Sequence, residues 1–284
     1  MPEPLRVCDA LEQARHAGVA RLDAQWLLGH LLQQPRSWLL SHDDSALPAP
    51  AAAAWPSLLQ RRADGEPLAY VVGEREFCGL KLEVSPAVLV PRPETEGLVR
   101  WALECAAGAP APTVVDLGTG SGAVALALKD QWPGARVTAT DASTAALEVA
   151  RCNGQRLGLA VDWRTGDWWQ AVSGARFGLA LSNPPYIAQD DAHLAALQHE
   201  PLQALTPGGD GLDALRRIIS GAPAHLLRGA WLLVEHGHDQ GEAVRALFAQ
   251  HGFVDNQRRV DLAGLPRCSG ARWPGVNQYR SVAP

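Results

Sequence analysis

Five consecutive residues, Ser182-Asn183-Pro184-Pro185-Tyr186, suit the binding of a planar nitrogen group. They follow the short apolar run 177–181, which is typical of a buried parallel strand. Proline has no N–H for a sheet ladder, so the two prolines must end the strand and open the backbone into a turn, here named the elbow (residues 182–186). The Asn183 side-chain oxygen and the Pro184 carbonyl are two acceptors beside the Tyr186 ring, which suits an amide or the exocyclic amine of a base. A proline-rich turn capped by asparagine would look the same, so the interpretation depends on the sequence upstream.

Upstream, the segment Asp116-Leu117-Gly118-Thr119-Gly120-Ser121-Gly122 continues an apolar strand that begins at residue 113 and enters a glycine-rich turn. A helical pattern follows over 123–129, and the next strand, 136–140, ends at Asp141, 25 residues after Asp116. Glycines let the backbone approach a ligand, and the helix after them presents free N–H groups. A carboxylate at the next strand end suits the two hydroxyls of a ribose. Strand, glycines, helix, strand and acid in this order predict a nucleoside site.

The charge in this segment distinguishes between nucleoside ligands. A dinucleotide fingerprint has the pattern G-x-G-x-x-G, whereas this chain has D-x-G-x-G-x-G with Asp116 first. An acid here would repel a pyrophosphate but can pair with an ammonium, which favours S-adenosylmethionine over NAD. A third strand, 161–164, leads to Asp167 and Trp168, where an acid can accept from an adenine amine and an indole can stack on the ring. One of the paired tryptophans, Trp168 and Trp169, is expected to pack in the core instead.

The 284 residues are enough for one large domain and a small one. Residues 1–65 have helical patterns over the first turns, around 22–31, over 37–41 and over 51–62, with 47–50 as a linker. Leu22, Trp26, Leu27 and Leu31 share one helix face. From residue 67 the pattern changes, and 70–73 with 77–84 predicts a β-hairpin between two domains. We therefore expect a helical substrate-recognition domain over 1–66, a hairpin linker over 67–86 and a catalytic domain over 87–284.

The remaining elements alternate between strands and helices. Helices are expected from residue 94 or 95 to 103, over 213–227 and over 241–250, and strands over 230–235 and 253–260. Such alternation predicts an α/β fold with a doubly wound parallel sheet. Two prolines around Arg92 and next to Glu94 make a stiff loop, which is either a hinge or a binding lip. His236-Gly237-His238 lacks a third metal ligand at a typical spacing, so a turn after a strand is the favoured interpretation.

Charge and cysteine usage restrict the partners and the compartment. The net charge is −5, with a sequence pI of about 6.0, so no basic excess favours nucleic acid, and we expect no direct sequence-specific nucleic-acid binding. The five scattered cysteines never form a C-x-x-C spacing, which fits free, mostly buried thiols in a reducing cytoplasm. There is no apolar signal core and no run near the ~18 apolar residues of a membrane span. We expect a soluble, cytoplasmic protein with no membrane association.

Together these motifs give the chain a family resemblance. It resembles the class I S-adenosylmethionine-dependent methyltransferases and, more narrowly, the release factor glutamine methyltransferases. The Asn-Pro-Pro-Tyr elbow is shared with DNA adenine methyltransferases, whereas Pro-Arg-Pro-Glu-Thr-Glu after a helical N-terminal domain is far more specific. The match runs through Glu66-Pro67-Leu68-Ala69-Tyr70, Gly73, Phe77, Gly79-Leu80, Pro91-Arg92-Pro93-Glu94-Thr95-Glu96, Asp116–Gly122, Asp167-Trp168, Asn183-Pro184-Pro185-Tyr186, Glu200-Pro201, Asp210-Gly211-Leu212 and Gln240-Gly241.

The resemblance implies a Rossmann-like methyltransferase domain with a mostly parallel, seven-stranded sheet. It also implies methyl transfer from S-adenosyl-L-methionine, leaving S-adenosyl-L-homocysteine, to the glutamine amide of the Gly-Gly-Gln motif in peptide chain release factors, without a metal. The chain departs from the family pattern at His199, where an aromatic residue is usual, and in the tail through residue 284. The expected catalytic residues are Asn183, Pro184 and Tyr186. The substrate glutamine is expected to contact these three residues and also Pro185, Arg92 and Glu94. The methyl donor is expected to contact Gly118, Thr119, Gly120, Ser121, Gly122, Asp141, Asp167, Trp168 and Asn183.

Three rival functions share parts of this pattern. An adenine-amine methyltransferase of DNA or RNA would have the same elbow but should show a basic groove. A glutamine methyltransferase of a ribosomal protein would use the same chemistry with a different N-terminal domain. A non-enzymatic nucleotide-binding module would have no use for an intact elbow.

Overall fold

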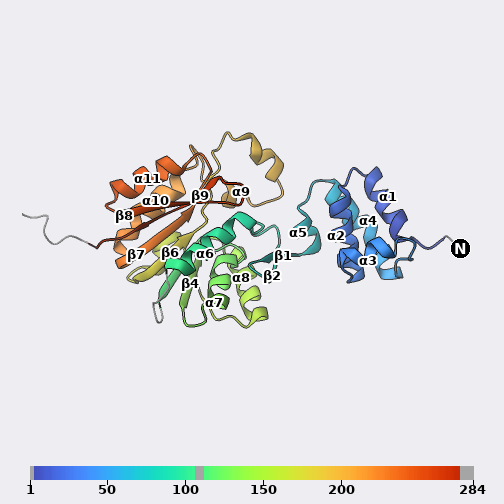
Figure 1. Cartoon of the computed structure of the whole chain (residues 1–284), viewed down its shortest axis with the longest axis horizontal. Coiled ribbons are helices and arrows are strands. Elements are labelled where there is room, and N and C mark those ends of the chain that lie inside the picture. The colour runs from blue at the N-terminus through green and yellow to red at the C-terminus, as the bar shows by residue number, and fades with distance from the viewer. Residues whose placement is uncertain (1–2, 106–111, 276–284) are drawn as a thin grey trace, which may run out of the picture. The chain divides into compact units, whose positions relative to one another are not determined.

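The computed structural model describes residues 3–105 and 112–275, and the chain divides into two compact units, Met1–Glu74 and Arg75–Pro284. The C-terminal tail beyond residue 275, which departs from the family pattern, lies outside the described residues. Figure 1 shows the helices of the first unit in blue to teal and the seven-stranded sheet of the second in green to red.

The first unit is helical, as its sequence predicts. Its core contains Leu27, Leu28 and Trp55, all fully buried, and the Trp55 indole donates to Gln13 Oε1 at 3.0 Å. A buried indole with a satisfied N–H fixes the packing between distant helices. The helices of this unit are α1 (Val7–His16), α2 (Arg21–Leu32), α3 (Arg36–Ser41), α4 (Ala49–Ala63) and α5 (Leu68–Val72).

Two expectations for this unit were wrong in detail. Helix α2 buries Leu27 and Leu28, whereas Leu22 and Trp26 are about half exposed (49% and 52%), so the buried face is rotated from the predicted one. The segment 47–50 is only partly a linker, because α4 begins at Ala49. Proline is tolerated in a first helical turn, where its missing N–H has no intrahelical acceptor.

The predicted hairpin exists but is shifted along the chain. Residues 70–72 belong to helix α5 instead of a strand, and Gly73 ends that helix with φ 84°. The strands are β1 (Glu74–Phe77) and β2 (Leu80–Glu83), joined by Cys78 and Gly79 with φ 49° and 81°. Two successive left-handed residues match the twist of a two-residue hairpin turn, which explains why the turn forms there.

The second unit is built on a seven-stranded sheet, as predicted. All adjacent pairs are parallel except those of the last strand in sequence, β9, which lies antiparallel between β7 and β8. The strand order is β5-β4-β3-β6-β7-β9-β8. The strands are β3 (Thr113–Leu117), β4 (Arg136–Asp141), β5 (Asp162–Thr165), β6 (Phe177–Ser182), β7 (Leu226–Glu235), β8 (Val254–Val260) and β9 (Pro266–Arg272).

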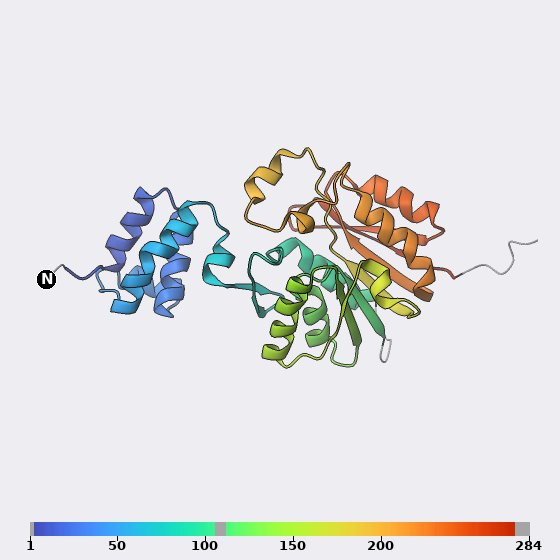
Figure 2. The ribbon, with the colours of Figure 1, turned by 180° about the vertical axis from the view of Figure 1, so that it is seen from behind.

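Helices cover both faces of this sheet (Figures 1 and 2). Alternate residues of a strand point to opposite faces, so Val114 joins one core cluster and Val115 the other. The first cluster includes residues of α6 and α7, and the second includes residues of α10 and α11. The helices of this unit are α6 (Glu96–Cys105), α7 (Ala123–Gln131), α8 (Thr144–Leu157), α9 (Leu202–Leu205), α10 (Asp213–Gly221) and α11 (Gly241–Gln250), with short 3-10 helices at Pro93–Thr95, Trp168–Val172, Ala192–Leu197 and Ala222–Ala224.

Two features at the C-terminal side of the sheet differ from the prediction. The helix expected over 213–227 ends at Gly221, and residues 226–227 already belong to β7. Strand β9 was not predicted. Its Gly270 leaves no room for a side chain, because a Cβ there would lie 2.5 Å from Leu233 and 2.6 Å from Trp101. Its register therefore depends on tertiary packing that the local pattern does not reveal.

Successive strands are added to one side of β3 first, and from β6 onward they are added to the other side. From β3 it proceeds outward to β4 and β5, and from β6 it proceeds the other way to β7. The two strands are paired with Leu117 beside Ser182, so the glycine-rich turn and the elbow leave the sheet side by side. The crevice at such a switch point is the usual ligand site of open α/β sheets.

Candidate active site

One pocket in the second unit opens at the carboxyl ends of β3, β4 and β6 and contains most of the predicted site residues. Asp116 also lines it. The pocket-lining residues that the sequence predicted are Arg92, Gly118, Thr119, Gly120, Ser121, Asp141, Asp167, Trp168, Asn183 and Pro185. Glu94, Gly122, Pro184 and Tyr186 are not among the residues that line it.

Asp141 connects the end of β4 to the glycine-rich turn. Its Oδ2 accepts from the Gly120 N–H at 2.9 Å, and its Oδ1 accepts from the Ser143 N–H at 2.9 Å. Burial raises the pKa of Asp141, and these N–H donors oppose that rise. Each carboxylate oxygen keeps a further lone pair, so the side chain can accept two ligand hydroxyls while it holds the turn.

Asp116 supplies a buried carboxylate at the end of β3. Its side chain is 1% exposed, and the Thr119 hydroxyl donates to Oδ2 at 2.6 Å. Burial, reinforced by the nearby charge of Asp141, raises the pKa of Asp116 to about 7. No cationic side chain in the described part of the chain forms an ion pair with this acid, so its environment fits a ligand that brings a positive charge.

The two tryptophans after β5 have different roles. Trp169 is a core residue: it is 6% exposed, and its indole N–H donates to the Ile218 carbonyl at 2.8 Å. Trp168 lines the pocket and packs so closely on Gly118 that a Cβ there would lie 3.0 Å from the indole. This confirms that one of the pair packs in the core. Asp167 is half exposed and forms an ion pair with Arg217.

Gly122 has a packing role that Gly120 in the same turn lacks. It precedes α7 with φ 83°, and a Cβ would lie 3.1 Å from both Leu126 and Trp163. Gly120 has φ 56° and open space around its Cβ position, within reach of a ligand. The motif therefore combines a glycine for close helix–sheet packing with glycines that let the backbone approach a ligand.

A buried threonine orients the Asn183 side chain. Asn183 Nδ2 donates to Thr95 Oγ1 at 3.1 Å, and Thr95 is 4% exposed. Because the amide is planar, this bond turns Oδ1 away from Thr95. Thr95 lies at the end of the 3-10 helix Pro93–Thr95, within the Pro-Arg-Pro-Glu-Thr-Glu segment. The sequence indicates this segment as a hinge or a binding lip, with residue 94 or 95 as a helix start, but it gives Thr95 no role at the site.

Tyr186 is fixed at both its backbone and its hydroxyl. The hydroxyl donates to Glu235 Oε1 at 3.3 Å, and the carbonyl accepts from Gln240 Nε2 at 2.9 Å. A Cβ at Gly211 would lie 2.4 Å from the same carbonyl oxygen, so the elbow and the 208–212 loop touch backbone to backbone. These contacts give a structural role to two segments of the family match, Asp210-Gly211-Leu212 and Gln240-Gly241, because both segments support the Tyr186 backbone.

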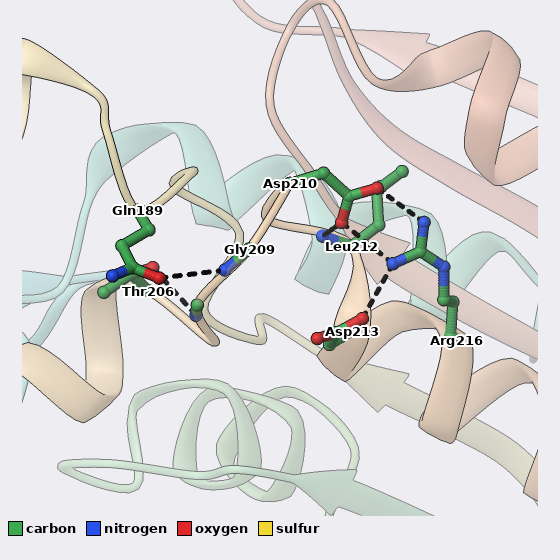
Figure 3. A network of polar contacts seen from close by, with 8 residues as sticks. Gln189, Thr206, Gly209, Asp210, Leu212, Asp213 and Arg216 are labelled. Atoms are coloured by element: carbon green, nitrogen blue, oxygen red, sulfur yellow. Dashed lines mark hydrogen bonds and ion pairs between the residues drawn. The ribbon is translucent and has the colours of Figure 1, made fainter.

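The loop that carries Gly211 is held by its own polar network (Figure 3). Arg216 clamps Asp210 through two N–H groups at 2.8 and 2.5 Å and contacts Asp213 at 2.7 Å. This pairing lowers the pKa of Asp210 to about 2. Asp210 Oδ1 also accepts from the Leu212 N–H at 3.1 Å, and Gln189 Oε1 accepts from the Gly209 N–H at 3.4 Å. The network keeps Gly211 against the elbow without help from a ligand.

We expect Gly211→Ala to damage the elbow more than Gly208→Ala. Both glycines have left-handed backbones (φ 80° and 86°), but a Cβ at Gly208 would meet only Gln189 Oε1 at 3.9 Å. The extra clash at Gly211 should lower the free energy of unfolding by ~1–3 kcal/mol more than the strain shared by both variants. Thermal unfolding of the pair measures the difference; equal losses would mean that the loop does not press on Tyr186.

Arg92 is held at the pocket by Glu200. The two form an ion pair in which the Glu200 side chain is only 2% exposed, and Glu200 Oε2 also accepts from the Val90 N–H at 3.1 Å. The sequence indicates no role for Glu200, whereas in the structure its carboxylate holds the loop around Arg92. Glu94 is exposed.

The His236-Gly237-His238 segment is a turn after β7, as predicted. His236 is fully buried, with Nε2 2.8 Å from Ser269 Oγ and Nδ1 2.7 Å from the Gly237 carbonyl. Within residues 3–105 and 112–275, no three His, Cys, Asp or Glu side chains gather as metal ligands, and no helix has the length and apolar character to cross a membrane. The expectation of mostly buried thiols was wrong: Cys268 is buried, but Cys8 and Cys152 are exposed.

Comparison with known proteins places the chain in a family. A model described as "PrmC N-terminal domain" matches residues 6–73, and one described as "Methyltransferase small domain" matches residues 102–260. The release factor glutamine methyltransferase of Bordetella pertussis is 51% identical over 256 residues, covering 89% of this chain and 95% of that protein. That of Xylella fastidiosa (strain Temecula1) is 48% identical over 278 residues, covering 97% and 100%. The chain belongs to the release factor glutamine methyltransferase family.

Solved structures support the fold of the methyltransferase domain. The T. thermophilus 16S rRNA N2 G1207 methyltransferase, solved with AdoMet and guanosine, is 20% identical and covers 70% of this chain and 49% of that one, with a TM-score of 0.54. The hMettl16 catalytic domain, solved with an RNA hairpin, is 15% identical and covers 81% and 83%, with a TM-score of 0.56. At such identities the likeness concerns the fold alone, and it agrees with a Rossmann-like methyltransferase sheet.

Proposed function

We propose that this protein transfers a methyl group from S-adenosylmethionine to the side-chain amide of the glutamine in the Gly-Gly-Gln motif of peptide chain release factors. The observation that carries the proposal is the convergence of the glycine-rich turn, Asp116, Asp141 and Asn183 on one pocket. The relatives' names, at 48% identity over nearly the whole chain, supply the substrate class. The helical unit Met1–Glu74 is proposed to recognise the release factor.

The donor fits the chemistry of the pocket. The buried, uncompensated carboxylate of Asp116 suits an α-ammonium, and the spare lone pairs of Asp141 suit the ribose hydroxyls. Trp168 presents an aromatic face beside Gly118, and Asp167 is proposed to accept from the adenine amine. When bound, S-adenosylmethionine supplies a methyl group activated by its sulfonium.

The elbow is proposed to orient the acceptor. An amide nitrogen is a poor nucleophile because its lone pair is delocalised into the carbonyl. Asn183 Oδ1 and the Pro184 carbonyl would accept its two hydrogens and strengthen those bonds as the nitrogen becomes positive. Such placement supplies up to ~7–11 kcal/mol. Tyr186 would pack on the amide plane, and Pro185, Arg92 and Glu94 would complete the contacts. No general base is needed, since an N-alkylated amide cation loses its proton readily.

Donor affinity should weaken as the pH falls below neutrality. Burial raises the pKa of Asp116 to about 7, so this acid becomes neutral below that pH and loses its attraction for an α-ammonium. Below the pKa of Asp116, we expect the donor dissociation constant to rise by up to ~10-fold for each pH unit; above that pKa it should be independent of pH. Calorimetry across this pH range measures the donor dissociation constant. The Asp116→Asn variant should bind the donor weakly at every pH. If the variant shows the same pH dependence of donor binding as the wild type, Asp116 is not part of the donor site.

Labelled donor with different acceptors tests the proposed reaction. Purified release factor should gain one methyl group at the glutamine of Gly-Gly-Gln, as located by peptide mass spectrometry. A release factor in which that glutamine is replaced by alanine is the matched control and should gain none. Methylation of a ribosomal protein or of DNA in place of release factor would contradict the proposal and identify the rival function.

A further inference from the structure

Asn153 is a fully buried amide on α8, and all of its hydrogen-bonding positions are used. It is 0% exposed. Nδ2 donates to the Ser121 carbonyl at 3.1 Å and to the Glu83 carbonyl at 3.0 Å, while Oδ1 accepts from the Glu83 N–H at 2.7 Å and from Arg156 Nη2 at 3.2 Å. Carbonyl oxygens accept and cannot donate, so these partners leave one orientation for the amide. A buried amide that is satisfied in this way fixes the segments that it joins.

The Asn153 amide joins two distant segments that both lead to the pocket. Ser121 belongs to the glycine-rich turn, lines the pocket and is 2% exposed. Glu83 ends strand β2, and the chain continues from it to residues 87–89, which line the same pocket. Asn153 itself is not among the lining residues, so it acts from behind the glycine-rich turn and does not touch a ligand in the pocket.

The glycine-rich turn needs such an anchor because its own backbone is weakly restrained. Ser121 lies between Gly120 and Gly122, whose φ angles of 56° and 83° are in the left-handed region. Glycine gives up more conformational freedom than any other residue when its backbone is fixed. Asp141 holds the Gly120 N–H, and Asn153 holds the carbonyl of the next residue. We propose that Asn153 is a positioning residue that, through the Ser121 carbonyl, fixes this turn in the conformation that binds the methyl donor.

The inference rests on the proposed function, because the methyl donor is the proposed ligand of the turn. A turn that is already ordered when the donor arrives loses no further conformational freedom on binding, so the anchor raises donor affinity. The four hydrogen bonds of Asn153 reach the glycine-rich turn, β2 and α8, and none of them reaches the elbow. Asn153 should therefore affect donor binding more than the chemical step.

Asn153→Asp tests the contact with Ser121. In mildly alkaline buffer the new side chain is a carboxylate, which still accepts from the Glu83 N–H but cannot donate to either carbonyl. The donor dissociation constant, measured by calorimetry with S-adenosylhomocysteine, should rise ~5–50-fold, because a buried carbonyl of the turn loses its partner. With saturating donor and release factor, kcat should fall by less than the affinity does. A folded variant with the wild-type dissociation constant overturns the inference.

Arg156→Ala is the matched control. Arg156 donates to the Lys81 carbonyl of β2 and pairs with Glu83 at 3.3 Å, so its loss weakens the attachment of the same hairpin to α8. The hydrogen bond from Asn153 to Ser121 remains in this variant. Thermal unfolding should detect a loss of stability in both variants, while only Asn153→Asp should weaken donor binding. An equal loss of donor affinity in both variants would attribute the effect to the hairpin and overturn the inference.

A second readout needs no substitution at Asn153. Saturation of the wild type with S-adenosylhomocysteine should shift the side-chain amide NMR signals of Asn153, because Nδ2 is bonded to a carbonyl of the turn that holds the ligand. Asn153 signals that do not respond to a bound ligand contradict the inference, even if Asn153→Asp fails to fold. A wild type that does not bind S-adenosylhomocysteine overturns both the inference and the proposed donor. If the ligand binds and the signals shift but release factor gains no methyl group, the proposed acceptor fails and the role of Asn153 stands.

Discussion

Asn183→Ala is expected to lower kcat by about 10²–10³, the effect of removing one preorganised polar contact from a developing charge. Asn183 lines the pocket and is held by Thr95, so its oxygen is fixed before the acceptor arrives. The truncated side chain leaves one amide hydrogen of the acceptor without a partner and its nitrogen free to turn. Steady-state kinetics with saturating donor measure kcat, and calorimetry measures donor binding, which we expect to weaken less.

The control for this variant is Asn256→Ala on the edge strand β8. Asn256 donates to the Arg245 carbonyl at 3.5 Å on the surface, so its loss removes an asparagine without touching the pocket. It should leave kcat unchanged. Near-normal turnover in Asn183→Ala would refute the assigned role of the elbow.

Asp141→Ala is expected to raise the donor dissociation constant by ~10–100-fold, because hydrogen bonds to a charged group are stronger than neutral ones. Two effects combine: the ribose loses its acceptors, and the Gly120 N–H loses the oxygen that holds the glycine-rich turn. Calorimetry with S-adenosylhomocysteine measures the change without turnover, and kcat with saturating donor should change less.

The control for this variant is Asp162→Ala, which removes a surface carboxylate at the start of the neighbouring strand β5. It pairs with Arg164 and is about half exposed, so its removal should not alter donor affinity. A dissociation constant in Asp141→Ala equal to that of the wild type would exclude Asp141 from the ribose site.

The sequence predicts the parts of this protein whose signals are local. Strand β3, the glycine-rich turn and Asp141 follow one another in order, and each has its own pattern, so their convergence was predictable. Helix α11 was predicted at its observed bounds of Gly241–Gln250, because an amphipathic stretch follows a turn. The elbow was predictable because two prolines end a strand whatever surrounds it.

The remainder depends on contacts between distant segments. Glu200 and Arg92 are 108 residues apart, and neither local pattern indicates the other. Thr95 contacts Asn183 only when the segment before α6 reaches the end of β6, and Glu235 contacts Tyr186 only when β7 lies beside β6. The segment 70–72 favours a strand by composition, but Gly73 ends a helix there. Strand β9 is inserted antiparallel where Gly270 admits the Trp101 ring, a packing requirement that its sequence alone does not display.

The most direct test is a crystal structure of this protein with S-adenosylhomocysteine and a Gly-Gly-Gln peptide. We expect the glutamine nitrogen to donate to Asn183 Oδ1 and to the Pro184 carbonyl, with the donor's sulfur facing that nitrogen. A glutamine amide bound elsewhere, or a sulfur that points away from the elbow, would contradict it.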